Sequence, residues 1–279
     1  MNFCPRVRDA GAALLCAALL VGAAPVDQSL PLQGFSLGSV VIGASVLKAV
    51  ERFGPPDFVQ TTDLGHEWQW IEAGGMDHEV LADDDMIVHQ VLVARPAPIP
   101  GQSPAPLVQP AEFAALGVSV DDATTSIESA GGDAVAEPDP AVRAWAVSGG
   151  VVVAELQNGV VGQLLALDDN FARRLGYLQP PPPVRTPVIY HAPQIIKEFD
   201  APYPDAAFRA NAGGRAVVRV LINAAGAPQD PRIVVSSGND AIDAVALENV
   251  RKSTYRAARC DDAPCSGVYF DLQDYWLTQ

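Results

Sequence analysis

Two short motifs in the N-terminal third place a serine in a spacing that some hydrolytic enzymes use. Gly34-Phe35-Ser36-Leu37-Gly38 is spelled like a nucleophile elbow, and Ser45-Val46-Leu47-Lys48 is spelled like the S-x-x-K motif of penicillin-recognising enzymes. The first motif requires a large parallel sheet around its serine, and too few residues precede it to build one. The second requires a later Lys-Thr-Gly, which the sequence lacks. Ser45 fits a helix N-cap instead, and we predict no catalytic residue.

Residue types that bind metals are present but dispersed. The four histidines are His66, His78, His89 and His191, and their spacing nominates no common site. Asp83-Asp84-Asp85 offers three carboxylates, but the ligand series of an EF-hand is absent and a turn between two strands accounts for the run. We therefore predict neither a metal site nor a cofactor.

The N-terminus has the pattern of an export signal. Arg6 and Arg8 precede an apolar run over residues 10–24 that is short for a membrane span and closes on small residues. We predict a cleaved signal peptide over 1–23 and a periplasmic mature protein. The alternative is an uncleaved inner-membrane anchor with the rest of the chain facing the periplasm. A lipid anchor at Cys16 is disfavoured because Leu15 is too large for the lipoprotein cleavage site.

The remaining cysteines suggest a local cross-link. Removal of the leader leaves Cys260 and Cys265 as the only cysteines, in an oxidising compartment, so we predict one structural disulfide that closes a short loop. A redox motif or a metal site is the alternative. The spacing is not C-x-x-C, however, and no histidine stands nearby to complete a metal shell.

The negative charge is concentrated in the N-terminal part of the chain. Residues 24–183 carry 6 Lys and Arg against 21 Asp and Glu, whereas residues 184–279 carry 10 against 11. An acidic surface is repelled by phosphate backbones and anionic headgroups, so nucleic acid is excluded as a partner and membrane contact is expected only if the leader stays uncleaved. Keeping the protein soluble is the simpler meaning of this charge.

Two proline-rich stretches, at 96–110 and 179–193, read as stiff linkers that divide the chain into segments 30–95, 111–178 and 194–279. The first two segments look like repeats, each a helix followed by three antiparallel strands. Trp70 precedes a Gly-Gly pair by four residues, as Trp145 does in the second copy. This layout resembles the small α+β envelope modules related to the lipoprotein BamE. Trp68 shares a strand face with Trp70, which suits core packing or a ligand platform.

The third segment has the clearest local patterns. Residues 215–223 alternate between two faces, and a return strand over 232–236 follows a turn, so both are predicted strands. Asn239 and Asp240 then begin a helix with apolar residues at helical spacing, and a final strand follows over 268–276. The sequence predicts an α+β fold: a three-stranded antiparallel sheet with helices, preceded by the two repeats.

A set of motifs in this segment resembles the TonB C-terminal domain family, over about residues 200–277. The motif residues are Tyr203, Pro204, Gly213, Gly214, Ser236, Ser237 and Gly238, with Ile242-Asp243, Ala246-Leu247 and Tyr255 after them. The resemblance implies a small antiparallel sheet with helices on one face. It also implies that the last strand pairs with a short segment of an outer-membrane receptor, which is strand addition at an exposed edge.

By this analogy we expect a non-enzymatic envelope protein that binds a protein partner along its last strand. The expected edge residues are Val268, Tyr269, Phe270, Asp271, Leu272, Gln273, Asp274, Tyr275 and Trp276. An edge that Asp271 and Asp274 protect against pairing is the open alternative. A second hypothesis is a membrane-anchored energy-transducing subunit of TonB-dependent transport. The leader lacks the charged or histidine side chain that such an anchor uses, and the linkers are not basic.

Overall fold

The computed structural model describes most of the three predicted segments. The described residues are 27–32, 34–73, 76–96, 114–115, 118–121, 134–136, 141–157, 159–178 and 189–276. The predicted signal peptide, most of both proline-rich linkers and the predicted helix of the second repeat lie outside these ranges. Within them, no helix is long and apolar enough to cross a membrane.

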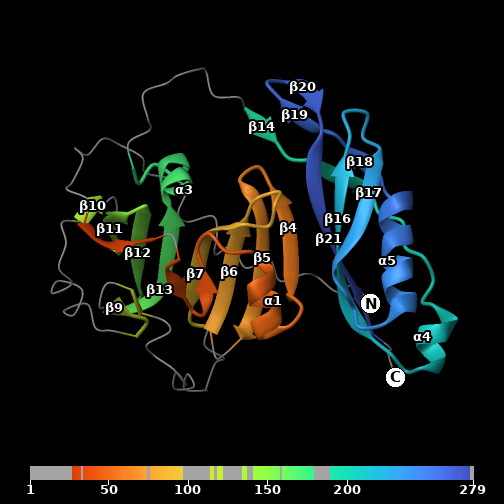
Figure 1. Ribbon diagram of the computed structural model, residues 1–279, viewed down its shortest axis with the longest axis horizontal. Coiled ribbons are helices and arrows are strands. Elements are labelled where there is room, and N and C mark those ends of the chain that lie inside the picture. Colours follow the sequence, from red (N-terminus) through yellow and green to blue (C-terminus); the bar gives the residue numbers. More distant parts are fainter. Residues whose placement is uncertain are drawn as a thin grey trace.

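One large sheet runs through both N-terminal segments (Figure 1). Its order is β1-β11-β12-β13-β7-β6-β5-β4, and β10 pairs with β11. The two segments meet where β7 pairs antiparallel with β13, with Leu92 opposite Leu165. The strands are β1 (Asp27–Pro31), β4 (Phe58–Thr62), β5 (Gly65–Ala73), β6 (Met76–Ala82), β7 (Val88–Ala94), β10 (Ala134–Ala136), β11 (Val142–Ser148), β12 (Gly150–Gln157) and β13 (Val160–Asp168).

After its helix the first repeat has four strands, one more than the sequence pattern predicted. Strand β4 follows helix α1 (Leu47–Phe53) and pairs with β5 through a tight turn at Asp63 and Leu64, which makes β4 the end of the large sheet. The hydroxyl of Ser45 accepts a hydrogen bond from the Leu47 N–H at 3.3 Å, but the N-cap of this helix is Val46, one residue after the predicted cap. The short strands are β2 (Ser36–Leu37), β3 (Val40–Val41), β8 (Ala114–Ala115) and β9 (Val118–Ser119).

Both faces of the large sheet are apolar. One face holds Trp68, Trp70 and Trp145, whose side chains are at most 4% exposed, so all three tryptophans are core residues and none forms a ligand platform. The other face is covered by helix α3 (Asp169–Arg174), which packs Phe171 and Ala172 against it. Asp168 caps this helix by accepting a hydrogen bond from the Phe171 N–H.

The C-terminal segment forms the predicted three-stranded antiparallel sheet with helices. Its order is β17-β16-β21, with β16 (Gly214–Ile222) in the middle, β17 (Pro228–Val235) on one side and β21 (Gly267–Tyr275) on the other. Helices α4 (Asp205–Arg209) and α5 (Asp240–Lys252) cover one face. The Asn239 side chain caps α5 by accepting hydrogen bonds from the N–H groups of Ala241 and Ile242.

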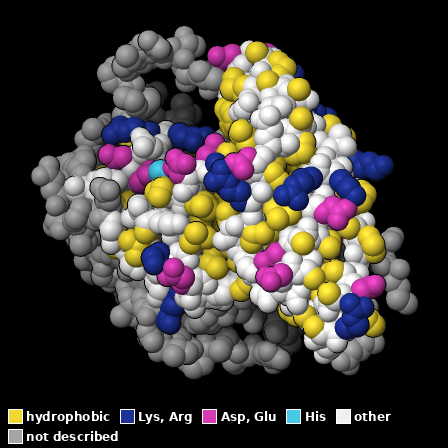
Figure 2. Space-filling view, turned by 45° about the vertical axis from the view of Figure 1, so that its right-hand side comes forward, with side chains coloured by type: hydrophobic (Ala, Val, Ile, Leu, Met, Phe, Trp, Pro, Cys, Tyr) yellow, Lys and Arg dark blue, Asp and Glu magenta, His cyan; other side chains and the backbone are white. Residues whose placement is uncertain are grey.

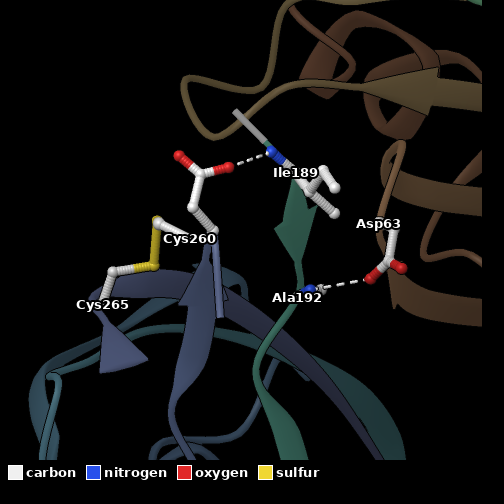
Figure 3. Close-up of a disulfide and its surroundings, with 6 residues drawn as sticks. Asp63, Ile189, Ala192, Cys260 and Cys265 are labelled. Atoms are coloured by element: carbon white, nitrogen blue, oxygen red, sulfur yellow. Dashed lines mark hydrogen bonds between the residues drawn. A yellow bond between two sulfur atoms is a disulfide. The ribbon is translucent and has the colours of Figure 1, made fainter. Parts of the chain in front are cut away.

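Short strands and a disulfide complete the top of this domain (Figure 3). Cys260 and Cys265 are bonded with a Cα–Cα distance of 5.8 Å, which confirms the predicted disulfide. It closes a hairpin whose first strand also pairs with the segment that enters the domain. The strands are β14 (Tyr190–His191), β15 (Gln194–Lys197), β18 (Thr254–Arg256), β19 (Ala258–Cys260) and β20 (Ala263–Cys265).

Candidate partner-binding edge

The predicted edge residues lie together on strand β21. Val268 to Tyr275 are within the strand, and Trp276 follows it with its side chain 62% exposed. The backbone of β21 pairs with β16 from Gly267 opposite Ile222 to Tyr275 opposite Gly214. Among the described strands β16 is its only ladder partner, so β21 is an edge strand.

The side chains of β21 alternate between two apolar environments. Tyr269 and Tyr275 point to the face that the helices cover, together with Asp271 and Gln273. Val268, Phe270 and Leu272 point the other way and join the core of the first repeat. Both faces of β21 are therefore covered, and a partner can approach it only along its backbone edge.

A polar network fixes the strand beneath helix α5. The Asn249 side-chain amide donates to Gln273 Oε1 and to the Tyr275 hydroxyl oxygen, both at 2.8 Å. Asn249 Oδ1 accepts from the Ala201 N–H at 2.9 Å. Asn249 is 1% exposed and fully hydrogen-bonded, so it holds α5, the entering segment and β21 in one arrangement.

Asp271 is a buried acid within this strand. Its residue is 9% exposed, and burial raises the pKa of its carboxyl group to about 6, with the Gln273 amide opposing the rise and the Glu198 charge adding to it. Asp274 is instead exposed on the strand and accepts a hydrogen bond from Arg215 at 3.3 Å. The two aspartates of the edge therefore occupy different environments.

The family-motif residues shape this domain without forming a common site. A Cβ on Gly213 would lie 2.8 Å from the Tyr275 carbonyl oxygen, and one on Gly214 would lie 2.3 Å from the Ser237 carbonyl oxygen, so only glycine fits there. The Tyr203 hydroxyl donates to the Ala212 carbonyl oxygen, and Pro204 is the N-cap of α4.

The Ser236-Ser237-Gly238 motif connects β17 to α5. Both serine hydroxyls donate to the Asp243 carboxylate, at 2.6 and 2.7 Å, and the Ser237 N–H donates to it at 2.8 Å. Gly238 has a φ of 84°, which glycine adopts without strain. Asp243 organises this turn from the first turn of the helix, where its negative charge is also favourable.

The other edge of the sheet is unsuited to pairing. Strand β17 contains Pro228 and Pro231, which have no N–H to donate, and Asp230 between them has a φ of 47°. Its ladder with β16 is interrupted at two places. Prolines and irregularities of this kind protect edge strands, so β21 is the better acceptor of an added strand.

The histidines serve as structural bridges. His66 is 2% exposed and lies between Thr61 and Asp84, with ring nitrogens 3.1 Å and 2.9 Å from their side-chain oxygens. His89 contacts Asp168 and Asp83, and its hydrogen bond with Asp168, aided by the one with Asp83, raises its pKa. Within the described ranges no three His, Cys, Asp or Glu side chains form a group able to hold a metal ion.

The face of the molecule drawn in Figure 2 carries no large patch of one charge. On the face shown in Figure 2, basic and acidic side chains are interspersed among apolar ones. Long-range electrostatic attraction from this face therefore does not select a strongly charged partner.

The sheet, its helical cover and one regular edge strand define a small α+β domain of the class that can accept a strand. Residues 200–270 match the family model described as Gram-negative bacterial TonB protein C-terminal. The C-terminal domain belongs to that family, as its motif residues predicted. The family is transport-associated and non-enzymatic, and its domain is one of the Gram-negative envelope.

Other comparisons add little. No curated protein matches the sequence at a significant level. Two solved structures are similar at 10% identity: an extracellular protein containing an SCP domain from Bacillus anthracis str. Ames (TM-score 0.28, covering 57% of this chain and 51% of that chain) and a cysteine-rich secretory protein from Staphylococcus aureus subsp. aureus Mu50 (TM-score 0.30, covering 53% and 51%). This chain spans about half the length of these proteins, and such low scores carry no argument about function.

Proposed function

We propose that this protein binds a protein partner of the envelope, a segment of an outer-membrane receptor, by strand addition along β21. The observation that carries the proposal is the difference between the two edges of the C-terminal sheet. Two prolines and an aspartate in the left-handed backbone conformation interrupt β17. Strand β21 is nine residues long and contains no proline, and its only glycine is its first residue, Gly267.

The backbone of β21 supports addition at alternate residues. The Phe270 N–H donates to a side chain outside the sheet, so it points away from β16. Because successive N–H groups of a strand alternate in direction, those of Leu272 and Asp274 point the same way. An added strand would satisfy these outward groups, and specificity would come from side chains next to Trp276 and Asp274.

Backbone amide NMR of the full mature chain tests this function. The probes are peptides of about ten residues from periplasm-facing segments of the host's outer-membrane receptors, a length that matches strand β21. Binding should shift the amides of Phe270, Leu272 and Asp274 and leave those of β17 unchanged. Control peptides that are N-methylated at every second residue lose the donors on one edge and should not bind. Shifts confined to other regions would rule out this edge.

We also propose that the mature protein begins at Ala24 and is released into the periplasm. The proposal depends on the short apolar run and the small residues that end the leader. N-terminal sequencing of the protein recovered from the periplasmic fraction should give Ala24 first. Recovery of intact Met1 in the membrane fraction would favour the anchored, energy-transducing alternative.

A further inference from the structure

Strand β4 of the first repeat lies beside the outer edge of β21. The Phe270 N–H donates to Thr61 Oγ1 at 3.0 Å, and this bond joins the two strands directly. Four residues along, Arg215 Nη1 donates to Asp57 at 2.6 Å, and its Nε donates to Asp274 at 3.3 Å. Asp57 lies four residues before Thr61 in the chain, whereas Asp274 lies four residues after Phe270. The two segments therefore pass each other in opposite directions. Strand β4 thus runs antiparallel to β21, and side-chain contacts join the two strands, with no backbone ladder between them among the described strands.

The side chains around these contacts form a closed interface. Phe270 is 1% exposed, and its ring centroid lies 4.4 Å from that of His66 and 5.5 Å from that of Trp68. The Trp68 ring is fully buried, and its N–H has no hydrogen-bond partner among the described residues. Burying that N–H unpaired costs free energy.

A second set of contacts closes the upper end of the interface (Figure 3). The Asp63 carboxylate accepts the Ala192 N–H at 2.7 Å and contacts His191 Nδ1 at 2.9 Å. His191 belongs to β14, which pairs with β19 beside the disulfide. The turn that follows β4 is thus fastened to the segment that enters the C-terminal domain.

There is no room for a third strand between β4 and β21. Adjacent strands of a sheet lie about 4.8 Å apart, so a strand inserted between two others needs them about 9.6 Å apart. Several Cα atoms of β4 lie within 8 Å of Cα atoms of β21. A partner strand therefore cannot enter while β4 is in place.

We propose that β4 is an intramolecular substitute for the partner strand, and that the first repeat keeps the binding edge of the C-terminal domain closed until β4 is displaced. This inference rests on the proposed function of β21. This closure would give the first acidic repeat a role, which is to set how tightly a partner must bind β21 in order to displace β4. Asp57 and Thr61, both outside the C-terminal domain, hold β4 beside β21 through their hydrogen bonds with Arg215 and with the Phe270 N–H.

The test uses the full mature chain carrying Asp57→Asn together with Thr61→Val, which removes the charge that pairs with Arg215 and the hydroxyl that accepts from the Phe270 N–H, with little change in shape. The matched control is Thr62→Val together with Asp230→Asn, a neighbouring threonine and an exposed carboxylate that do not contact β21. The first readout, without ligand, is amide hydrogen exchange at Phe270 and Leu272. The second is the affinity for the receptor peptides described above.

We expect exchange at these amides to accelerate, and peptide affinity to rise, by about five- to thirtyfold in the opened variant and to remain unchanged in the control. Equal affinity of the peptides for the wild-type and opened forms would overturn the inference and leave strand addition standing. Peptides that bind none of the forms, the opened one included, would overturn the proposed function and this inference with it.

Discussion

Replacing Asp271 by asparagine should stabilise the protein above pH 6. The carboxyl group is buried on the helix-covered side of β21, where burial raises its pKa from 3.8 to about 6. The folded state therefore holds the proton more tightly than the unfolded state does. The contribution of this carboxyl group to stability is highest below pH 4, falls as the pH rises to about 6, and is constant above that.

The magnitude follows from the difference between the two pKa values. A rise of the Asp271 pKa by about two pH units corresponds to about 3 kcal/mol of stability, which wild type loses at this group between pH 4 and pH 7. Asparagine has the same shape, carries no charge at any pH and keeps an oxygen that accepts from the Gln273 amide, which bonds Asp271 at 2.8 Å. The variant should gain about 2–3 kcal/mol over wild type at pH 8 and nothing at pH 4.

Urea unfolding at pH 4, 5, 6, 7 and 8, followed by far-ultraviolet circular dichroism, measures this difference. Asp274→Asn is the matched control, because Asp274 is on the same strand but exposed. For Asp274→Asn, the plot of unfolding free energy against pH should run parallel to that of wild type. A constant offset between Asp271→Asn and wild type at all five pH values would refute the argument that an ionised buried carboxylate causes the loss.

Three further predictions concern stability. Asn239→Ala removes the cap of α5 and should lower the free energy of unfolding by about 1 kcal/mol in urea, whereas an unchanged value would show that the cap is replaced by water. Phe270→Ala empties a buried site between the domains and should cost about 3–5 kcal/mol, with Phe208→Ala, an exposed phenylalanine on α4, as the neutral control. Replacing Cys260 and Cys265 by serine should cost about 2 kcal/mol, since the loop they close is short, and a loss well above that would mean that the disulfide also holds the entering segment.

The local structure of the C-terminal domain could be predicted because its signals are local. The alternation of side chains along β16 assigned Ala216 and Val218 to one face of the strand and Arg215 and Val217 to the other. In the structure Ala216 and Val218 are buried beneath the helices. The Asn239 cap and the Cys260–Cys265 disulfide depend on neighbouring residues in the same way. Periodicity and capping chemistry are sufficient for such features.

The contacts between domains could not be predicted in this way. Val217 and Phe270 are fully buried on the second face of the sheet, but alternation shows only that they share a face and does not identify what covers it. The bond between Thr61 and Phe270 joins residues more than 200 positions apart. The joining of two repeats into one sheet through β7 and β13 also pairs residues about 70 positions apart, such as Leu92 and Leu165. One signal was present, because apolar residues on both faces of β21 indicate a strand covered twice.

Because β4 and β21 are parts of one chain, their contact does not depend on protein concentration. A segment held near its site by a short tether behaves as if it were present at about millimolar concentration, so a free partner in the micromolar range faces about a thousandfold excess of the internal strand. A partner with a small contact area would be outcompeted at any realistic abundance. Productive partners must therefore either bind β21 much more tightly than β4 does, or be concentrated themselves, as a segment fixed to a membrane surface is.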